Sequence, residues 1–309
     1  MKVIIILNTA AGSLSSARAA DRKRSLAEAF SAAGIEAEIP SITGGNLDHE
    51  AKTAAASAVD VVVACGGDGT ISSVARALVG TAMPLGIVPL GTLNHFAKDL
   101  KIPLDVAAAV QVIAAGRVSR IDVGDVNGRV FINNSSLGVY PHFVLNRDSQ
   151  RQRHGLSKWA AMLPAVLNVF RRFPMVHLRL ATDAKTIERK TPLVFIGNND
   201  YQFDLFNFGQ RNRLDCGELS LSIAKVHTRW GLFKLTMRSL AGCSDRARDV
   251  ETFHASSCLI ETRRHRLPIA LDGEVIHLLP PLHYCIRPAA LSVCVPDNPA
   301  NCYAEAATG

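Results

Sequence analysis

The 309-residue sequence lacks the patterns that indicate a membrane-spanning, disulfide-stabilised or zinc-binding protein. No apolar run approaches the roughly 18 residues of a membrane-spanning helix. The seven cysteines are an odd number and form no C-x-x-C pair, which argues against a disulfide framework or a zinc ribbon. The ten histidines show no H-x-x-x-H spacing. We therefore expect a cytoplasmic protein with reduced thiols and no zinc site.

Composition favours a folded protein with anionic partners. Hydrophobic residues make up 48% of the chain, which excludes disorder throughout. The net charge of +7 favours nucleotides, acidic lipid headgroups or nucleic acid as partners. Nothing beyond charge indicates nucleic-acid binding, so we expect none. The N-terminal apolar run is short and leads into a glycine-containing turn, which predicts a first core strand and not a signal peptide.

Strand and helix patterns alternate over the first 100 residues. This alternation predicts a doubly wound parallel sheet, with its ligand loops at the carboxyl ends of the strands. The expected strands are Val3–Leu7, Ile35–Ile39, Val59–Cys65 and Leu85–Val88, and the expected helices are Ser13–Ala33 and Leu47–Ser57.

Three loops at equivalent strand ends contain glycine, threonine or asparagine. They are Asn8–Ser13, Gly66–Thr70 and Gly91–Asn94. After the second loop a helix is expected to begin at Ile71, capped by Thr70 or Ser72. A strand, a glycine turn and a helix together present backbone N–H groups to an anion. Asp68 would repel phosphate there unless it holds a cation or accepts a proton, which indicates phosphate chemistry; the alternative is a turn-stabilising aspartate.

After residue 120 the pattern changes to a two-residue period. Ile121–Val126 and Val130–Asn134 flank an Asn127-Gly128 hairpin turn, and many strands with few helices indicate an antiparallel β-sandwich. The further strands expected are Val176–Thr182, Leu193–Asn198, Leu219–Val226, Cys258–Thr262, Leu267–Leu271, Val275–Leu279 and Leu291–Val295. Helices are expected near Leu156–Phe170 and Arg229–Ala241. The predicted domains are 1–120, α/β, and 121–290, β-sandwich, followed by a C-terminal segment, 291–309.

Three motifs in this order resemble the diacylglycerol kinase catalytic family. They are Gly66-Gly67-Asp68-Gly69-Thr70, Gly91-Thr92-Leu93-Asn94 with Phe96-Ala97, and Asp272-Gly273-Glu274. The resemblance covers nearly the whole chain and is to the bacterial soluble lipid kinases related to sphingosine kinases. The first motif alone is shared with NAD kinases and phosphofructokinases. The family implies an N-terminal α/β nucleotide domain of the kind found in NAD kinases, a C-terminal antiparallel β-sandwich, and a chain end that returns to the first domain.

The resemblance also implies roles for particular residues. Glu274 matches the family's proton acceptor, Asp68 lies beside the phosphates and the metal, and Asp272 belongs to the same catalytic motif. Whether Asp68 or Glu274 takes the proton stays open. Without the resemblance, the Asp-Gly pair predicts a plain hairpin turn. The implied ATP contacts are Asn8, Thr9, Gly12, Thr43, Gly66, Gly67, Asp68, Gly69, Thr70, Ile71, Ser72, Thr92 and Asn94.

The sequence departs from the family pattern at three places. Asn8-Thr9 stands where Asn-Pro is usual, and Asn94-His95 replaces Asn-Asp, which weakens capping of the following helix. At Asp215-Cys216 a cysteine replaces the second of two aspartates, which in some members helps to hold a structural Mg²⁺. Magnesium prefers oxygen to sulfur, so that site is in doubt. The metal ligands expected here are Asp68 and Asp215.

The segment Leu156–Phe173 has apolar residues at helical spacing with arginine and lysine around them. Two interpretations stay open: a helix packed on the sandwich, or a lip that contacts the membrane and covers acyl chains.

We predict an enzyme that uses ATP and Mg²⁺ to phosphorylate a lipid hydroxyl. Diacylglycerol is the first choice, followed by related acylglycerols, phospholipids and sphingoid lipids. The lipid partner implies transient contact of a cytoplasmic protein with the inner membrane, and the oligomeric state stays open. One alternative is an NAD kinase-like enzyme, although those enzymes usually carry an Asn-Glu pair that is missing here. The other is a non-catalytic nucleotide-binding regulator, which would be expected to lose Asp68 or Glu274.

Overall fold

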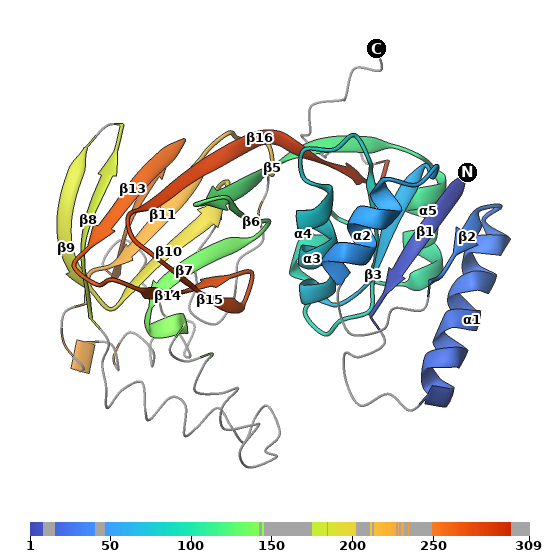
Figure 1. Cartoon of the computed structure of the whole chain (residues 1–309), viewed down its shortest axis with the longest axis horizontal. Helices are drawn as coiled ribbons and strands as arrows, with labels where there is room; N and C mark the ends of the chain where they lie inside the picture. The colour runs from blue at the N-terminus through green and yellow to red at the C-terminus, as the bar shows by residue number, and fades with distance from the viewer. Residues whose placement is uncertain are drawn as a thin grey trace. The chain divides into compact units, whose positions relative to one another are not determined.

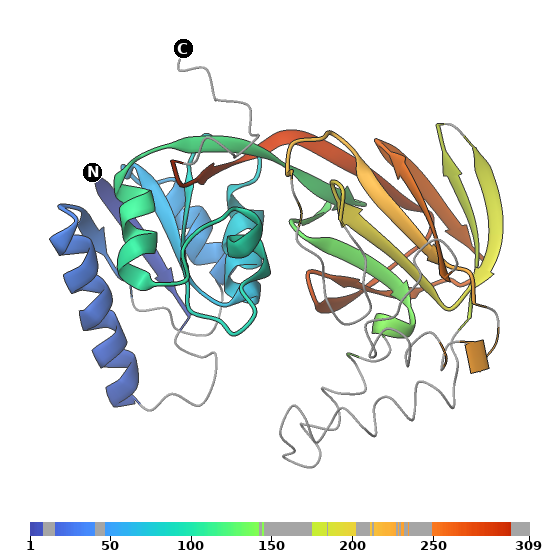
Figure 2. The same ribbon diagram turned by 180° about the vertical axis from the view of Figure 1, so that it is seen from behind.

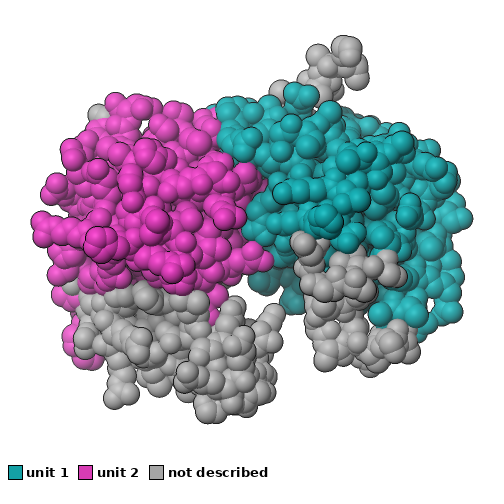
Figure 3. Space-filling view, in the orientation of Figure 1, with its two compact units in different colours: residues 1–123, 212–216, 287–309 teal, residues 124–211, 217–286 magenta. Residues whose placement is uncertain are grey.

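The chain folds into two compact units, which Figure 3 colours separately. Unit 1 comprises Met1–Val123, Asn212–Cys216 and Arg287–Gly309, and unit 2 comprises Gly124–Arg211 and Gly217–Ile286. The computed structural model describes residues 1–8, 16–40, 47–141, 144, 175–183, 185–201, 211, 213–226, 228, 230–231, 234 and 249–297.

Unit 1 is built on parallel strands in the order β2-β1-β3-β4, followed by the C-terminal part of β16. The strands are β1 (Lys2–Leu7), β2 (Glu36–Glu38), β3 (Val61–Gly66), β4 (Leu85–Pro89) and β16 (Leu282–Cys294). Every residue of β3 and β4 is buried, as expected for parallel strands covered on both faces. The predicted parallel α/β architecture is confirmed.

Helices cover both faces of this sheet. The helices α1 (Ser16–Ala32) and α5 (Val106–Ala114) share one core with β1 and β3, to which α1 contributes Leu26 and Phe30. On the other face α2 (Leu47–Ala55) packs against α3 (Asp68–Leu78) (Figures 1 and 2). The short helix α4 (His95–Asp99) follows the loop after β4. This arrangement leaves the loops after β3 and β4 at the carboxyl edge of the sheet.

Unit 2 contains two sheets of antiparallel strands, which confirms the predicted β-sandwich. One has the order β12-β11-β10-β7-β14-β15, and the other is formed by β16-β13-β8-β9, with β5 paired to β16 and β6 paired to β5. The strands are β5 (Val118–Val126), β6 (Arg129–Phe131), β7 (Asn134–Gly138), β8 (Val176–Thr182), β9 (Thr186–Thr191), β10 (Leu193–Asn198), β11 (Leu219–Ala224), β12 (Val250–Ala255), β13 (Ser257–Thr262), β14 (Leu267–Leu271) and β15 (Glu274–Leu278).

The core of unit 2 is apolar with one buried hydroxyl pair. Leu, Ile and Val from both sheets fill it, and the hydroxyl of Tyr284 lies 2.9 Å from Ser135 Oγ. Burial raises the pKa of the Tyr284 phenol and raises the pKa of the Cys258 thiol to about 12. Both groups therefore stay protonated at neutral pH, and Cys258 behaves as a small apolar side chain.

Some strands differ from the expectation for identifiable reasons. The strands β9 and β12 were not predicted because both are sheet edges with mixed polar sequences, β9 largely exposed and β12 mostly half-buried. The expected strand Leu291–Val295 is only the end of β16, whose earlier part is obscured in the sequence by Pro288. The expected strand Val130–Asn134 is divided at Ile132, where the chain passes from β6 in one sheet to β7 in the other.

The strands β5 and β16 each belong to both units. The chain first leaves unit 1 within β5, after Val123, and, apart from the short stretch Asn212–Cys216, returns to it within β16, at Arg287. The helix expected at 156–170 lies outside the described residues, as does most of the one expected at 229–241. In the part of the chain that the structure describes, no helix has the length and apolar character needed to span a membrane.

Candidate active site

The helix after β3 begins earlier than predicted. Gly67 is its N-cap, in an extended conformation, and the Gly67 carbonyl accepts the first helical hydrogen bond from Ile71 N at 3.1 Å. The expected start at Ile71 with a Thr70 or Ser72 cap is therefore wrong. The Thr70 side chain packs instead against Gly66, where an added Cβ would lie 2.5 Å from Thr70 Oγ1. The first-turn N–H groups of α3, from Asp68 onward, are the ones that helix geometry leaves for an anion.

The loops after β3 and β4 pack directly against each other. Leu90 N donates to Gly66 O at 2.8 Å. A Cβ added to Gly91 would lie 2.6 Å from Gly67 Cα, a backbone atom that cannot turn aside. Glycine at position 91 is therefore required for this approach.

Asp68 joins the two loops through its carboxylate. Its Oδ2 accepts a hydrogen bond from Asn94 N at 3.0 Å, and its Oδ1 accepts one from His95 N at 2.7 Å. Asn94, at φ +52°, closes its own loop: its side chain accepts from Gly91 N at 3.0 Å and donates to Gly91 O at 2.9 Å. The replacement of aspartate by His95 was expected to weaken capping of α4. Asp68, from the turn after β3, supplies a cap instead by accepting from the first amide of α4.

The Asp68 carboxylate retains acceptor capacity for a cation. An ionised carboxylate has about four lone-pair positions, and the two amides use two of them. The side chain is half-buried beside the first turn of α3. Its surroundings therefore fit both a structural role and a metal ligand near phosphates, and the second role stays a prediction.

The other expected ATP contacts in unit 1 differ in exposure. Thr92 and Gly69 are exposed, and Asn8 Nδ2 donates to Thr70 Oγ1 at 3.4 Å. Ile71 and Ser72 are buried, at 0% and 1% exposed, so only their backbone could reach a nucleotide. The remaining three, Thr9, Gly12 and Thr43, lie outside the described residues.

Asp215 is placed in unit 1 but is paired with a cation. Its Oδ1 lies 3.0 Å from Arg213 Nε, and its carboxylate is 12% exposed. An adjacent arginine offsets the charge that would attract Mg²⁺. Among the described residues, no group of three or more His, Cys, Asp or Glu side chains is arranged to hold a metal. A metal role for Asp215 stays a prediction.

The Asp272-Gly273 turn of unit 2 is a tight hairpin that ties down a neighbouring segment. Both turn residues have positive φ, +48° and +85°, as the Asp-Gly pair predicts. The Asp272 carboxylate accepts hydrogen bonds from Ile132 N at 3.0 Å, Asn133 N at 2.8 Å and Asn134 N at 3.2 Å. Glu274, the first residue of β15, is exposed. The hairpin is confirmed, and the catalytic assignments of Asp272 and Glu274 stay predictions.

Sequence reasoning missed a buried polar group behind this turn. Arg211 is 0% exposed, and its Nη1 donates to Ile132 O at 2.7 Å. Its Nη2 donates to Asn133 Oδ1 at 2.8 Å. The sequence did contain one signal of a buried polar network: two Asn-Asn pairs, 133–134 and 198–199, each at the end of an apolar run.

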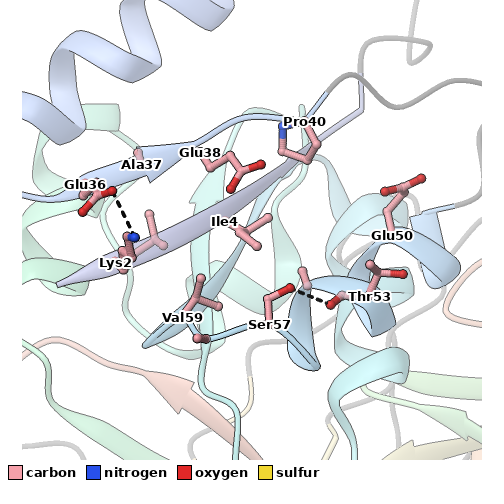
Figure 4. Close-up of a pocket in the computed structure, with 13 residues that line it drawn as sticks. Lys2, Ile4, Glu36, Ala37, Glu38, Pro40, Glu50, Thr53, Ser57 and Val59 are labelled. Atoms are coloured by element: carbon pink, nitrogen blue, oxygen red, sulfur yellow. Dashed lines mark hydrogen bonds and ion pairs between the residues drawn. The ribbon is translucent and has the colours of Figure 1, made fainter.

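A pocket of about 540 Å³ lies elsewhere in unit 1, beside β1, β2 and α2 (Figure 4). Its wall includes Lys2, whose Nζ lies 3.3 Å from Glu36 Oε1. None of the glycine-loop residues described above lines it. The pocket is therefore separate from the candidate site.

Comparisons with known proteins agree with this architecture. The family model of the diacylglycerol kinase catalytic domain matches residues 2–126, and that of the YegS C-terminal NAD kinase beta sandwich-like domain matches residues 145–295. Three solved structures of proteins from Bacillus anthracis str. Sterne are similar in fold. Their TM-scores are 0.73, 0.66 and 0.70 at 22%, 20% and 22% identity, over 97% of this chain and 96%, 98% and 98% of theirs. The second is described as a diacylglycerol kinase.

Curated relatives include proteins named diacylglycerol kinase from Staphylococcus aureus strains Newman and NCTC 8325 / PS 47. Each is 28% identical over 186 residues, which is 59% of this chain. The chain spans 58% of the length of these relatives. Both the α/β unit and the β-sandwich thus match family models, in the order in which the three motifs occur. The chain belongs to the diacylglycerol kinase catalytic family.

Proposed function

We propose that the protein is a lipid kinase that uses ATP and Mg²⁺ to phosphorylate a lipid hydroxyl, with diacylglycerol as the first candidate substrate. One observation carries the proposal: Asp68 joins the two glycine loops at the N-terminus of α3. In a chain of this family, such a cradle suits the phosphates of a nucleotide.

Phosphoryl transfer requires that the triphosphate be held, its charge neutralised and the acceptor hydroxyl oriented. The first-turn amides of α3 and the glycine loops suit the first task. Mg²⁺, when bound, would neutralise phosphate charge, and Asp68 is the residue that would hold it. We assign the hydroxyl proton to Glu274, because the remaining lone pairs of Asp68 are assigned to Mg²⁺ in this proposal and Glu274 is the exposed carboxylate of the third motif.

The proposed substrate lies in a bilayer, so we also propose transient contact with the inner membrane. The support is the net charge of +7 and the basic apolar segment 156–173, which lies outside the described residues. Co-sedimentation with anionic liposomes at low salt, weakened by added salt, is the expected result. Binding that is absent at low salt would contradict this part of the proposal.

The deciding experiment is transfer of ³²P from γ-labelled ATP to diacylglycerol, monoacylglycerol, phosphatidylglycerol, sphingosine and NAD in parallel. Label in a lipid phosphate, lost when Mg²⁺ is chelated, is the expected result. Label in NAD would establish the alternative enzyme, which the match to an NAD kinase-like sandwich makes the main competitor. Nucleotide binding without any labelled product would indicate a regulator.

A further inference from the structure

One peptide group in unit 2 is held between a buried cation and a carboxylate. The carbonyl of Ile132 and the N–H of Asn133 belong to the same peptide plane. The carbonyl accepts a hydrogen bond from Arg211 Nη1 at 2.7 Å, and the N–H donates to Asp272 Oδ1 at 2.8 Å. The peptide dipole thus has its negative end at the guanidinium and its positive end at the carboxylate.

The guanidinium is embedded in a network of backbone and amide acceptors. Its Nη1 also donates to Asn198 O at 3.3 Å, and its Nη2 donates to Asn133 Oδ1 at 2.8 Å. Asn198, itself 0% exposed, donates from Nδ2 to Ile132 O at 2.9 Å and from its backbone N to Asn133 O at 2.9 Å. A buried charge with this many directed bonds fixes the position of the Ile132–Asn133 corner more strictly than apolar packing would.

The same corner fixes the Asp-Gly turn. Besides the three bonds to the Asp272 carboxylate, Asp272 N donates to Asn134 O at 2.9 Å. The turn therefore carries four hydrogen bonds to residues 132–134. Glu274 follows two residues after Asp272 and pairs with Leu271 across the hairpin. Its backbone position is set by the position of the turn.

We propose that Arg211 is a positioning residue that acts through the Ile132–Asn133 peptide and Asp272 to hold Glu274 in place for phosphoryl transfer. The inference rests on the proposed function, in which Glu274 accepts the hydroxyl proton. It also assigns Asp272 to positioning, because its carboxylate is occupied by three amide donors.

The first test separates kcat from the KM for ATP in Arg211→Met and Arg211→Lys. A displacement of about 1 Å at a reacting group costs up to about a hundredfold in rate, so Arg211→Met should lower kcat by that order with the KM for ATP unchanged. Arg211→Lys, which keeps a donor and the charge, should recover part of kcat. The matched control is Arg179→Met, whose side chain is exposed and paired with Glu261 at 3.4 Å in the same unit. Equal kcat in the folded Arg211→Met variant and the wild type would overturn the inference.

The second test asks whether Arg211 acts through Asp272. If it does, Arg211→Met combined with Asp272→Asn should lower kcat no further than the more damaging single change. Losses that multiply would show independent roles and overturn the link.

A third measurement holds even if Arg211→Met fails to fold or the wild type phosphorylates no lipid. Hydrogen exchange of the amides of residues 132–134 should become faster in Asp272→Asn, and in Asn133→Ala, which removes only one guanidinium contact. Unchanged exchange in both variants would overturn the inference by itself. If exchange is faster in these variants but the wild type phosphorylates no lipid, the structural link is preserved and the proposed function is overturned.

Discussion

The glycine turn of unit 1 and the Asp-Gly turn of unit 2 are held by the same kind of hydrogen bond, but the two aspartates differ in how many such bonds they accept. In each, an aspartate carboxylate accepts hydrogen bonds from backbone amides of a neighbouring segment. Asp68 accepts two, from Asn94 and His95, at the start of a helix. Asp272 accepts three, from consecutive residues that a buried arginine holds from the other side.

Under the proposed function, this difference suits different tasks for the two aspartates. Asp68 keeps lone pairs for a cation and lies beside the helical N–H groups that suit phosphate. Asp272 is more fully occupied, and the proposed function therefore places the proton transfer on Glu274, the exposed carboxylate of the same motif. In the proposed function Asp68 is a metal ligand and Asp272 a scaffold residue, and the two differ in the number of amide donors, two against three.

The largest effect is expected from Glu274→Gln. Removing the proposed proton acceptor should lower kcat by about a hundredfold or more. The melting temperature should stay unchanged, because the side chain is exposed. Steady-state phosphorylation of the accepted lipid, with a thermal melt as control, measures both. Near-normal kcat would remove Glu274 from the mechanism.

Asp68→Asn should also lower turnover by about a hundredfold, but with a second signature. The amide can accept from only one side, so one bond to Asn94 or His95 is lost and stability should fall by about 1 kcal/mol. The Mg²⁺ concentration required for half-maximal rate should rise. Turnover that is retained while stability falls would show that Asp68 is purely structural.

Gly91→Ala tests the packing of the two loops. The added methyl group would lie 2.6 Å from Gly67 Cα, so one loop must move, at an expected cost of about 1–3 kcal/mol. The KM for ATP should rise as well. The stability control is Gly69→Ala, where an added Cβ meets no atom within 4 Å and the free energy of unfolding should not fall. Equal stability of the two variants would contradict the packing argument.

The smallest effect is expected from Asp105→Ala. This change removes a hydrogen bond from a backbone amide to an aspartate carboxylate, as Asp68→Asn does, but away from the candidate site. Asp105 caps α5 by accepting from Ala108 N at 2.9 Å. Losing this cap should cost about 1 kcal/mol in unfolding free energy and leave kcat and KM unchanged. A change in kcat would mean that stability and turnover are coupled in unit 1, and the Asp68→Asn result would need correction for it.

The sequence was sufficient for features whose signal is local. Gly66–Thr70 and Asp272–Glu274 are recognisable because positive φ and close backbone approach select glycine within a few residues. The position of the helix start was not recoverable, because it depends on the Gly67 carbonyl and on Thr70 packing under Gly66. A side-chain cap looks equally good in the sequence.

Contacts made by tertiary structure were not recoverable either. The bond from His95 to Asp68 and the bond from Arg211 to Ile132 join segments that are far apart in the chain. No periodicity marks such pairs, and a single arginine in a polar stretch usually indicates solvent exposure. The edge strands β9 and β12 were missed because their polar sequences lack the clear apolar alternation that identifies buried strands.

The path of β16 has a consequence for synthesis. Val293 of β16 pairs with Leu85 of β4, and Cys294 lies in the core of unit 1. On the ribosome, β4 is made long before its neighbour and must wait as an uncovered sheet edge until every strand of unit 2 has emerged. Unit 1 therefore completes its fold last although most of it is translated first, and we expect a chaperone that shields β4 in the interval to raise the yield of native protein.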